Sequence, residues 1–239
     1  MHADKEGDKM KELIAISNRK LCGSDFLDQI KRIADAGFDR IILREKDLTP
    51  DAYQALAEQV MRALEPYETI CTLHSFLEAA VKLQVKSIHL PLPLLLEKES
   101  EILAWMQQCY MEQKESPLSE DCEGLHNPYE VGSSIHSVEE LQKVKGLQER
   151  LHINRMYITA SHVFPTECKK NLPARGIPFL ETICKQADMP VYALGGIAPE
   201  NLERVFLAGA DGACLMSYTM RASEKELKEV VKRRNCLQF

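Results

Sequence analysis

The chain has 239 residues, a formal net charge of −6 at pH 7 and a hydrophobic share of 45%. This length fits one large domain or two small ones, and the apolar share is sufficient for a globular core. The negative net charge provides no basic field for nucleic acid or anionic lipid, and no apolar run approaches the roughly 18 residues that a membrane-spanning helix needs.

The N-terminal segment and the cysteines indicate the expected compartment. Residues 1–10, MHADKEGDKM, are charged and contain no apolar core. They do not have the pattern of a secretory signal and are expected to form a flexible tail. The eight cysteines show no CxxC pair and no even spacing. We interpret them as reduced thiols of a cytoplasmic protein, with a zinc cluster as the alternative.

Short apolar runs alternate with helix-period segments along almost the whole chain. The expected strands cover residues 13–16, 40–43, 69–73, 87–90, 129–132, 155–159, 191–194 and 213–216. The expected helices cover residues 24–36, 50–64, 76–84, 97–110, 137–149, 177–187, 200–208 and 224–235. Parallel strands need helical crossovers, so eight such units predict an α/β fold, a single-domain (β/α)8 TIM barrel over residues 1–239. A doubly wound open sheet is the alternative.

Helix-start signals support this division of the chain. Thr49-Pro50 places a capping hydroxyl before a proline at the first helical position. Ser75, Ser137 and Ser223 each precede a glutamate by three residues, the spacing of a capping box.

One segment interrupts the alternation between the fourth and fifth expected strands. Residues 111–128 are polar and acidic and contain few apolar side chains. We interpret them as a surface insertion that follows a helix, and a lid over a site is the alternative.

Polar side chains gather at the carboxyl ends of the expected strands, where barrels of this type place their functional groups. These positions are Arg44, Glu45, Lys46, His74, Ser75, His89, Ser133, Ser134, His136, Ser161, His162, Thr166, Lys169, Lys170, Gly195, Gly196, Met216 and Ser217.

A glycine pair at the end of the seventh strand predicts a phosphate site. Gly195 and Gly196 precede a helix start, so bare backbone amides and a partial positive charge can face an anion. Met216 and Ser217, at the end of the last strand, add amides and a hydroxyl. A tight turn that needs glycine for its geometry alone is the alternative.

The acid–base candidate is His162, because an imidazole takes and returns a proton near neutral pH. A purely structural histidine is the alternative. Arg44 and Lys46 supply cations for a carboxylate or a second anionic group. Glu45 is expected either to face outward or to pair with one of them. Three histidines could bind zinc, but no neighbouring Asp or Glu supports a magnesium site, so no metal is expected.

Six motifs follow one another over about residues 12–220. They are Ile42-Leu-Arg-Glu-Lys46, Ser87-Ile-His-Leu90, Gly132-Ser-Ser-Ile-His136, His162-Val-Phe-Pro-Thr-Glu-Cys-Lys169, Ala193-Leu-Gly-Gly-Ile197 and Ala208-Gly-Ala-Asp-Gly212. Together these motifs resemble the thiamine phosphate synthase/TenI superfamily. The resemblance implies a barrel that binds a small phosphorylated thiazole, and it makes a homodimer an expected assembly.

Within this superfamily, the synthases join a pyrimidine diphosphate to a thiazole phosphate. The resemblance implies that they hold magnesium on carboxylates after the third and fourth strands. This chain has His74-Ser75 and the Pro91-Leu-Pro-Leu-Leu95 run there, without a carboxylate. Without the metal, a diphosphate leaving group loses its main charge stabilisation.

The sequence is most similar to the TenI-type thiazole tautomerase branch, which aromatises a carboxythiazole phosphate by a proton shift without a cofactor. By this resemblance His162 is the catalytic histidine, and Gly195, Gly196 and Ser217 hold phosphate. The substrate-contacting set is expected to be Arg44, Lys46, His74, Ser134, Thr166 and Lys169, with His74 where the family typically has Asn. The alternatives are a magnesium-dependent thiamine phosphate synthase and a non-catalytic barrel that binds a thiamine precursor.

Overall fold

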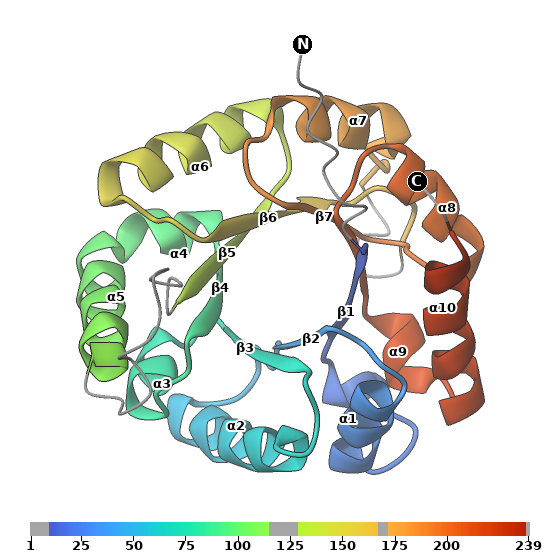
Figure 1. The fold of residues 1–239 in the computed structure, drawn as a ribbon, viewed down its shortest axis with the longest axis horizontal. Helices are drawn as coiled ribbons and strands as arrows, with labels where there is room; N and C mark the ends of the chain where they lie inside the picture. The colour runs from blue at the N-terminus through green and yellow to red at the C-terminus, as the bar shows by residue number, and fades with distance from the viewer. Residues whose placement is uncertain (1–9, 115–128, 167–171, 238–239) are drawn as a thin grey trace.

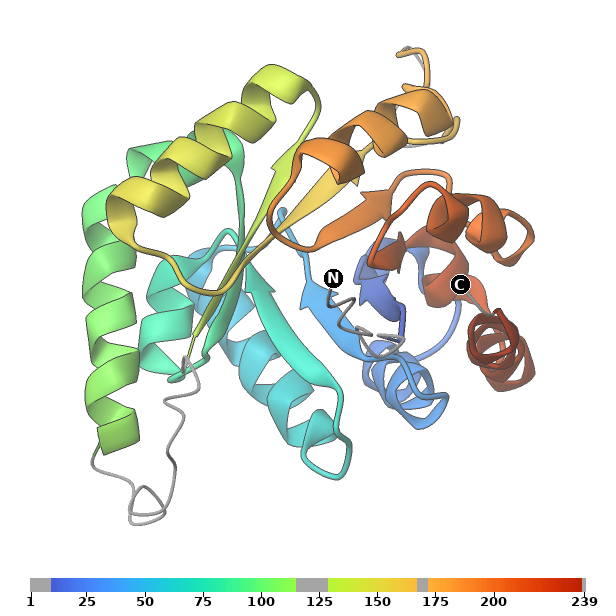
Figure 2. The same ribbon diagram turned by 45° about the horizontal axis from the view of Figure 1, so that its top comes forward.

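The structure is a computed structural model that describes residues 10–114, 129–166 and 172–237. Eight parallel strands pair in chain order, and β8 pairs with β1, so the sheet closes into a barrel surrounded by helices (Figures 1 and 2). The strands are β1 (Glu12–Ile16), β2 (Arg40–Leu43), β3 (Ile70–His74), β4 (Ser87–Pro91), β5 (Glu130–Ile135), β6 (Met156–Ser161), β7 (Val191–Leu194) and β8 (Gly212–Leu215). Closure confirms the predicted barrel, and the open-sheet alternative is wrong.

The helices lie outside the strands and follow them along the chain. They are α1 (Phe26–Asp35), α2 (Pro50–Leu64), α3 (Leu77–Lys82), α4 (Leu92–Glu97), α5 (Glu99–Lys114), α6 (Val138–Leu151), α7 (Gly176–Gln186), α8 (Leu202–Leu207), α9 (Ser217–Arg221) and α10 (Glu224–Cys236), with 3₁₀ turns η1 (Arg19–Leu21) and η3 (Pro199–Asn201). None of the helices in the described ranges combines the length and the hydropathy that crossing a membrane would need.

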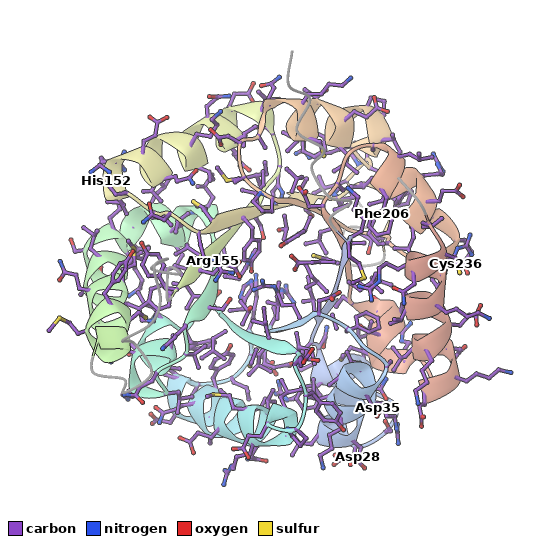
Figure 3. The ribbon with its side chains drawn as sticks, viewed as in Figure 1. Asp28, Asp35, His152, Arg155, Phe206 and Cys236 are labelled. Atoms are coloured by element: carbon purple, nitrogen blue, oxygen red, sulfur yellow. The ribbon has the colours of Figure 1, made fainter. Side chains whose placement is uncertain are left out.

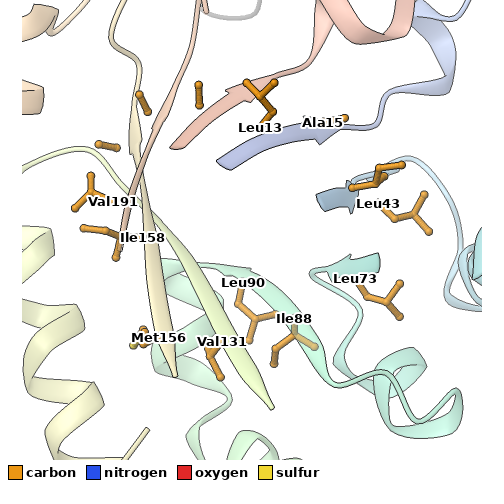
Figure 4. Packing of buried hydrophobic residues seen from close by; sticks show 14 of the residues in the cluster. Leu13, Ala15, Leu43, Leu73, Ile88, Leu90, Val131, Met156, Ile158 and Val191 are labelled. Carbon is orange, nitrogen blue, oxygen red and sulfur yellow. The ribbon is translucent and has the colours of Figure 1, made fainter. Parts of the chain in front are cut away.

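The main core lies between the strands and the helices. Strand side chains alternate between two faces, and the outward set packs on the helices in one large cluster of buried apolar residues. Leu13, Leu43, Leu73 and Leu90 belong to it (Figure 4). Each such leucine contributes about 1.5–3 kcal/mol when it leaves water.

Inward side chains fill the barrel itself (Figure 3). Ile14, Ile16, Ile42, Tyr157, Tyr192 and Cys214 form a second buried cluster. Gly132 makes room for this layer, because a Cβ at that position would lie 2.1 Å from the Tyr157 ring. Below this layer, at the amino ends of the strands, the filling becomes polar.

Arg40 is the centre of that polar end and is 1% exposed. Its Nη1 donates to Thr72 and Ser87 at 2.9 Å each and contacts the Glu130 carboxylate, while Nη2 lies 3.9 Å from Glu12. These partners come from β3, β4, β5 and β1, so one side chain joins half of the barrel. A buried charge needs such partners, since leaving water is costly.

The helix caps follow the sequence signals, with two corrections. Thr49 caps α2, and Ser223 forms the predicted capping box of α10 with Glu226. Ser137 caps α6 through the Glu140 amide, but the Glu140 carboxylate accepts from the His136 amide, so the predicted capping box does not form there. The capping box predicted at Ser75 is wrong: α3 has Phe76 at its N-cap, and the Ser75 hydroxyl bonds to His74 instead.

The region after β4 contains more helix than the pattern indicates. α4 was not predicted, and α5 continues through Lys114, so residues 111–114 of the predicted insertion are helical. Residues 115–128 and residues 1–9 of the predicted tail lie outside the described ranges, and Met10 is exposed. α9, directly after β8, was also not predicted.

Replacement of Arg40 by alanine is expected to lower the free energy of unfolding by about 3–5 kcal/mol, because Glu12 and Glu130 would lose a buried counter-charge. The matched control is Arg155→Ala (Arg155 is labelled in Figure 3), which removes a half-exposed guanidinium 3.2 Å from the same Glu130 carboxylate. It should cost less than about 1 kcal/mol. Urea unfolding followed by circular dichroism measures both, and equal costs would contradict the central role of Arg40.

Candidate functional site

A cavity of about 950 Å³ opens at the carboxyl ends of the strands. We call it the mouth cavity. The predicted site residues that line it are Arg44, His74, Ser134, His162, Thr166, Gly195, Gly196, Met216 and Ser217. Lys46 is exposed and is not part of the lining, and Lys169 lies outside the described residues. The fold therefore brings most of the predicted residues to one place.

The glycine pair packs against the loop after β6. Gly195 and Gly196 have φ of +98° and +65°, conformations that side chains disfavour. A Cβ on Gly195 would lie 2.3 Å from the His162 Cβ, and one on Gly196 would lie 2.5 Å from the Pro165 carbonyl oxygen. This packing is sufficient to require glycine at both positions, as expected for a tight turn that needs glycine for its geometry.

The same turn also presents backbone amides. The Gly195 carbonyl accepts from the Phe164 amide at 3.0 Å, and the Gly196 carbonyl accepts from the Asn201 side chain at 2.8 Å. The amides of both glycines have no acceptor among the described residues. The helix that follows is shorter than expected, a 3₁₀ turn before the six-residue α8. The amides, more than a helix dipole, are therefore the groups available to an anion.

The loop after β8 adds a cation that the sequence analysis missed. α9 starts at Ser217 and ends at Arg221, and Arg221 lines the mouth cavity. Arg221 has no ion-pair partner in the part of the chain that the structure describes. Glu226 also lines the cavity, but both the Ser223 amide and the Ser223 hydroxyl donate to its carboxylate, and these bonds lower its pKa. No sequence signal separated Arg221 from other surface arginines.

Arg44 provides a cation on the β2 side of the cavity. The residue is half-buried, and its guanidinium makes no hydrogen bond or ion pair with a described residue. The adjacent Glu45 is buried and turned away, where it accepts from Ser17 at 2.7 Å and from the Arg19 guanidinium at 3.0 Å. Glu45 therefore pairs with Arg19 rather than with Arg44 or Lys46, so it leaves the Arg44 charge available to a ligand.

Two stacked histidines line the wall beside Arg44. The His74 and His89 rings lie 5.4 Å apart, and His89 bonds to Tyr157 at 3.1 Å and to Ser134 at 2.7 Å. Burial, followed by the Arg40 charge, lowers the pKa of His89 to about 3. Burial, the neighbouring His89 and the charges of Arg44 and Lys46 lower the pKa of His74 well below 6.5. Both rings are neutral at pH 7.

His162, the predicted acid–base residue, lies in the cavity wall and is 3% exposed. Its Nε2 lies 3.3 Å from the Leu172 carbonyl oxygen, which can only accept, so Nε2 carries the proton of the neutral ring. Its Nδ1 is buried and has no hydrogen-bond partner. An unpartnered buried nitrogen costs stability, so this atom lacks the hydrogen bond that buried polar groups normally make.

The donor set does not fit magnesium. Among the described lining residues, Glu226 is the sole carboxylate, and the ends of β3 and β4 present His74, Ser75 and Pro91. No group of three metal-binding side chains occurs in the described residues. Magnesium prefers oxygen ligands, above all carboxylates.

The cysteines in the described ranges are free thiols, namely Cys22, Cys71, Cys109, Cys184, Cys214 and Cys236. Burial raises the pKa of Cys71 and Cys184 to about 12, and it raises the pKa of Cys214 as well. These three thiols are protonated at neutral pH and are weak nucleophiles.

Residues 13–218 match the family described as TMP-TENI, thiamine monophosphate synthase. The chain belongs to this family. It is therefore a member of an enzyme family of thiamine biosynthesis, as the six motifs indicate.

The relatives carry the names of synthases. The chain is 26% identical over 216 residues to "Thiamine-phosphate synthase" of Syntrophomonas wolfei, a match that covers 90% of each protein. It is 25% identical over 217 residues to "Thiamine-phosphate synthase 2" of Streptococcus pneumoniae, covering 85% of this chain and 84% of the relative. The solved structure of thiamine phosphate pyrophosphorylase from Pyrococcus furiosus shares the fold, with a TM-score of 0.71 at 20% identity over 95% of this chain and 96% of that one.

The substitution Gly195→Ala is expected to destabilise the protein by several kcal/mol, because the new methyl group would clash with His162 in a strained backbone conformation. The control is Gly146→Ala in α6, where a Cβ has nothing within 4 Å and should stabilise the helix by about 0.5–1 kcal/mol. Thermal unfolding compares the two variants. A Gly195→Ala variant as stable as the parent protein would refute the tight packing of this turn.

Stability is expected to fall between pH 7 and pH 5 through His89 and His74. Their folded-state pKa values lie below 6.5, so the unfolded chain binds protons that the folded chain does not, and stability present above pH 6.5 is lost as the pH falls. For His89 the loss at pH 5 is about 2 kcal/mol. His89→Gln should reduce the measured pH dependence of the unfolding free energy by that amount.

The control for this measurement is His152→Asn, which changes an exposed histidine that caps α6 in a left-handed conformation that Asn tolerates. This variant should keep the parent pH dependence. An unchanged dependence in His89→Gln would contradict the assignment.

Proposed function

We propose that the chain is a thiazole tautomerase-like isomerase, which aromatises a carboxythiazole phosphate through His162. The observation that carries the proposal is the charge balance of the mouth cavity. Arg44 and Arg221 lack partners among the described residues, Gly195 and Gly196 line the cavity, and the described carboxylate, Glu226, accepts hydrogen bonds from Ser223. Such a site suits an anionic substrate whose reaction moves a proton and no phosphoryl group.

The substrate has two anionic ends, and the cavity offers a group for each. The phosphate is proposed to bind at Gly195, Gly196, Met216 and Ser217, and the carboxylate at Arg44. These anchors would fix the thiazole ring between them in the middle of the cavity. Fixing both ends converts binding energy into orientation of the reacting carbon.

His162 is proposed to carry the proton. The imidazole takes the proton from C2, and the electron pair of that C–H bond moves into the ring. The exocyclic double bond becomes a single bond as its carbon receives the proton back from the same imidazole. The histidine ends in its starting form, and the product gains an aromatic ring, which drives the reaction forward.

The test is to add the purified protein to the dearomatised carboxythiazole phosphate and follow the absorbance of the aromatic isomer. We expect a clear acceleration over buffer. His162→Ala should reduce kcat by about 10²–10⁴-fold, the usual contribution of an acid–base group. His152→Asn, a surface substitution, should leave the rate unchanged. A wild-type rate equal to that of buffer would refute the proposal.

The second candidate is a thiamine phosphate synthase, which the names of the relatives favour. Magnesium-dependent release of pyrophosphate from the pyrimidine diphosphate and the thiazole phosphate would establish it. We expect no such release, because the described ends of β3 and β4 carry no carboxylate. Calorimetry that shows tight binding of a thiazole phosphate without turnover in either assay would favour a non-catalytic binder.

A further inference from the structure

His74, the last residue of β3, places one imidazole nitrogen at the mouth cavity without a partner. The residue is 6% exposed and lines the cavity. Its Nδ1 lies 2.7 Å from the Ser75 hydroxyl. Its Nε2 has no hydrogen-bond partner among the described residues, and it is not one of the buried unpaired atoms, so it opens to the cavity.

The ring is held on several sides. The His74 amide donates to the Tyr53 hydroxyl at 2.9 Å, and that hydroxyl donates to the Leu43 carbonyl at 2.6 Å. The ring stacks on His89, which Tyr157 and Ser134 fix in turn. A group held in this way needs little reorganisation when a ligand binds.

The contact with Ser75 links the His74 tautomer to the direction of one hydrogen bond. The Ser75 hydroxyl has one acceptor in the described structure, the His74 Nδ1. If the hydroxyl donates to Nδ1, the proton of the neutral ring lies on Nε2 and points at the cavity. Ser75 has a φ of 69°, which is uncommon for a residue other than glycine. Such conformations persist where they serve a local contact, and this one accompanies the bond between Ser75 and His74.

The ring is uncharged at neutral pH. The charged or titratable groups that act on it are His89, Arg44 and Lys46, and together with burial they lower its pKa well below 6.5. A neutral imidazole with so low a pKa is a poor acid and a poor base at pH 7. With Ser75 donating to Nδ1, the neutral ring carries its proton on Nε2 and can serve as a fixed hydrogen-bond donor.

We infer that His74 is a catalytic residue that donates an Nε2–H hydrogen bond to the substrate carboxylate, beside Arg44. This role rests on the proposed function. When C2 loses its proton, negative charge spreads onto the adjacent carboxylate oxygens, and a donor aimed there binds the transition state more tightly than the substrate. His74 transfers no proton, since the base that takes the C2 proton and returns it is His162.

The test compares two substitutions at His74 in the tautomerase assay. His74→Leu removes the donor and should lower kcat by about 10²–10³-fold, with a smaller effect on KM. His74→Asn keeps an N–H donor and should recover most of the lost rate. A purely structural role would not separate the two variants by kcat. Equal kcat values for His74→Leu and wild type would overturn the inference while leaving the proposed function intact.

Two further measurements test the tautomer. Nitrogen-15 NMR of the wild-type protein at pH 7 should show His74 neutral with the proton on Nε2. Ser75→Ala, which removes the hydroxyl and keeps the Cβ, should lower kcat and shift the tautomer balance toward Nδ1. A protonated Nδ1 in the wild-type protein would overturn the inference. Wild-type protein without tautomerase activity would instead refute the proposed function and this role with it.

Discussion

The site depends on the contact between the end of β7 and the loop after β6. Gly195 and Gly196 lie against His162, Phe164 and Pro165 with no space for a side chain. Backbone bonds from Val163 and Phe164 to the carbonyls of Leu194 and Gly195 lock the two segments together. The same contact that excludes a side chain therefore brings His162 and the glycine pair to one wall of the mouth cavity. The turn is therefore compatible with both interpretations of the glycine pair, as a tight turn that needs glycine for its geometry and as a phosphate site.

The positive charge of the mouth cavity depends on which partners the nearby carboxylates of Glu45 and Glu226 bind. Glu45 stands next to Arg44 in the sequence, yet its carboxylate bonds to Ser17 and Arg19, which follow β1. Glu226 completes the cap of α10. Because Glu45 and Glu226 are bonded elsewhere, neither carboxylate forms an ion pair with Arg44 or Arg221. The two guanidinium groups therefore remain available to an anionic ligand. The neutral histidines beside Arg44 add polar groups to this wall without adding charge.

Much of the fold could be predicted from the sequence because alternating apolar runs and cap residues are local signals. The bounds of β2 and β7 agree with the expected ranges, and Thr49 and Ser223 cap the helices they precede. Ser75 also has the spacing of a capping box, but its hydroxyl bonds to the His74 ring instead of capping α3. No local sequence pattern predicts which of these two hydrogen bonds forms. The placement of Arg221 in the cavity depends on α9, a helix too short to show a period. The partner of Glu45 depends on a loop 26 residues away in sequence.

The filled interior of the barrel determines how a ligand can enter and leave the mouth cavity. Ile14, Ile42, Tyr157 and Tyr192 block the passage between the strands, and the Arg40 cluster closes the opposite end. The mouth cavity is thus a blind pocket, so whatever enters it must depart by the same opening. Product has to vacate that opening before the next molecule arrives, and an accumulating product competes directly with the incoming one.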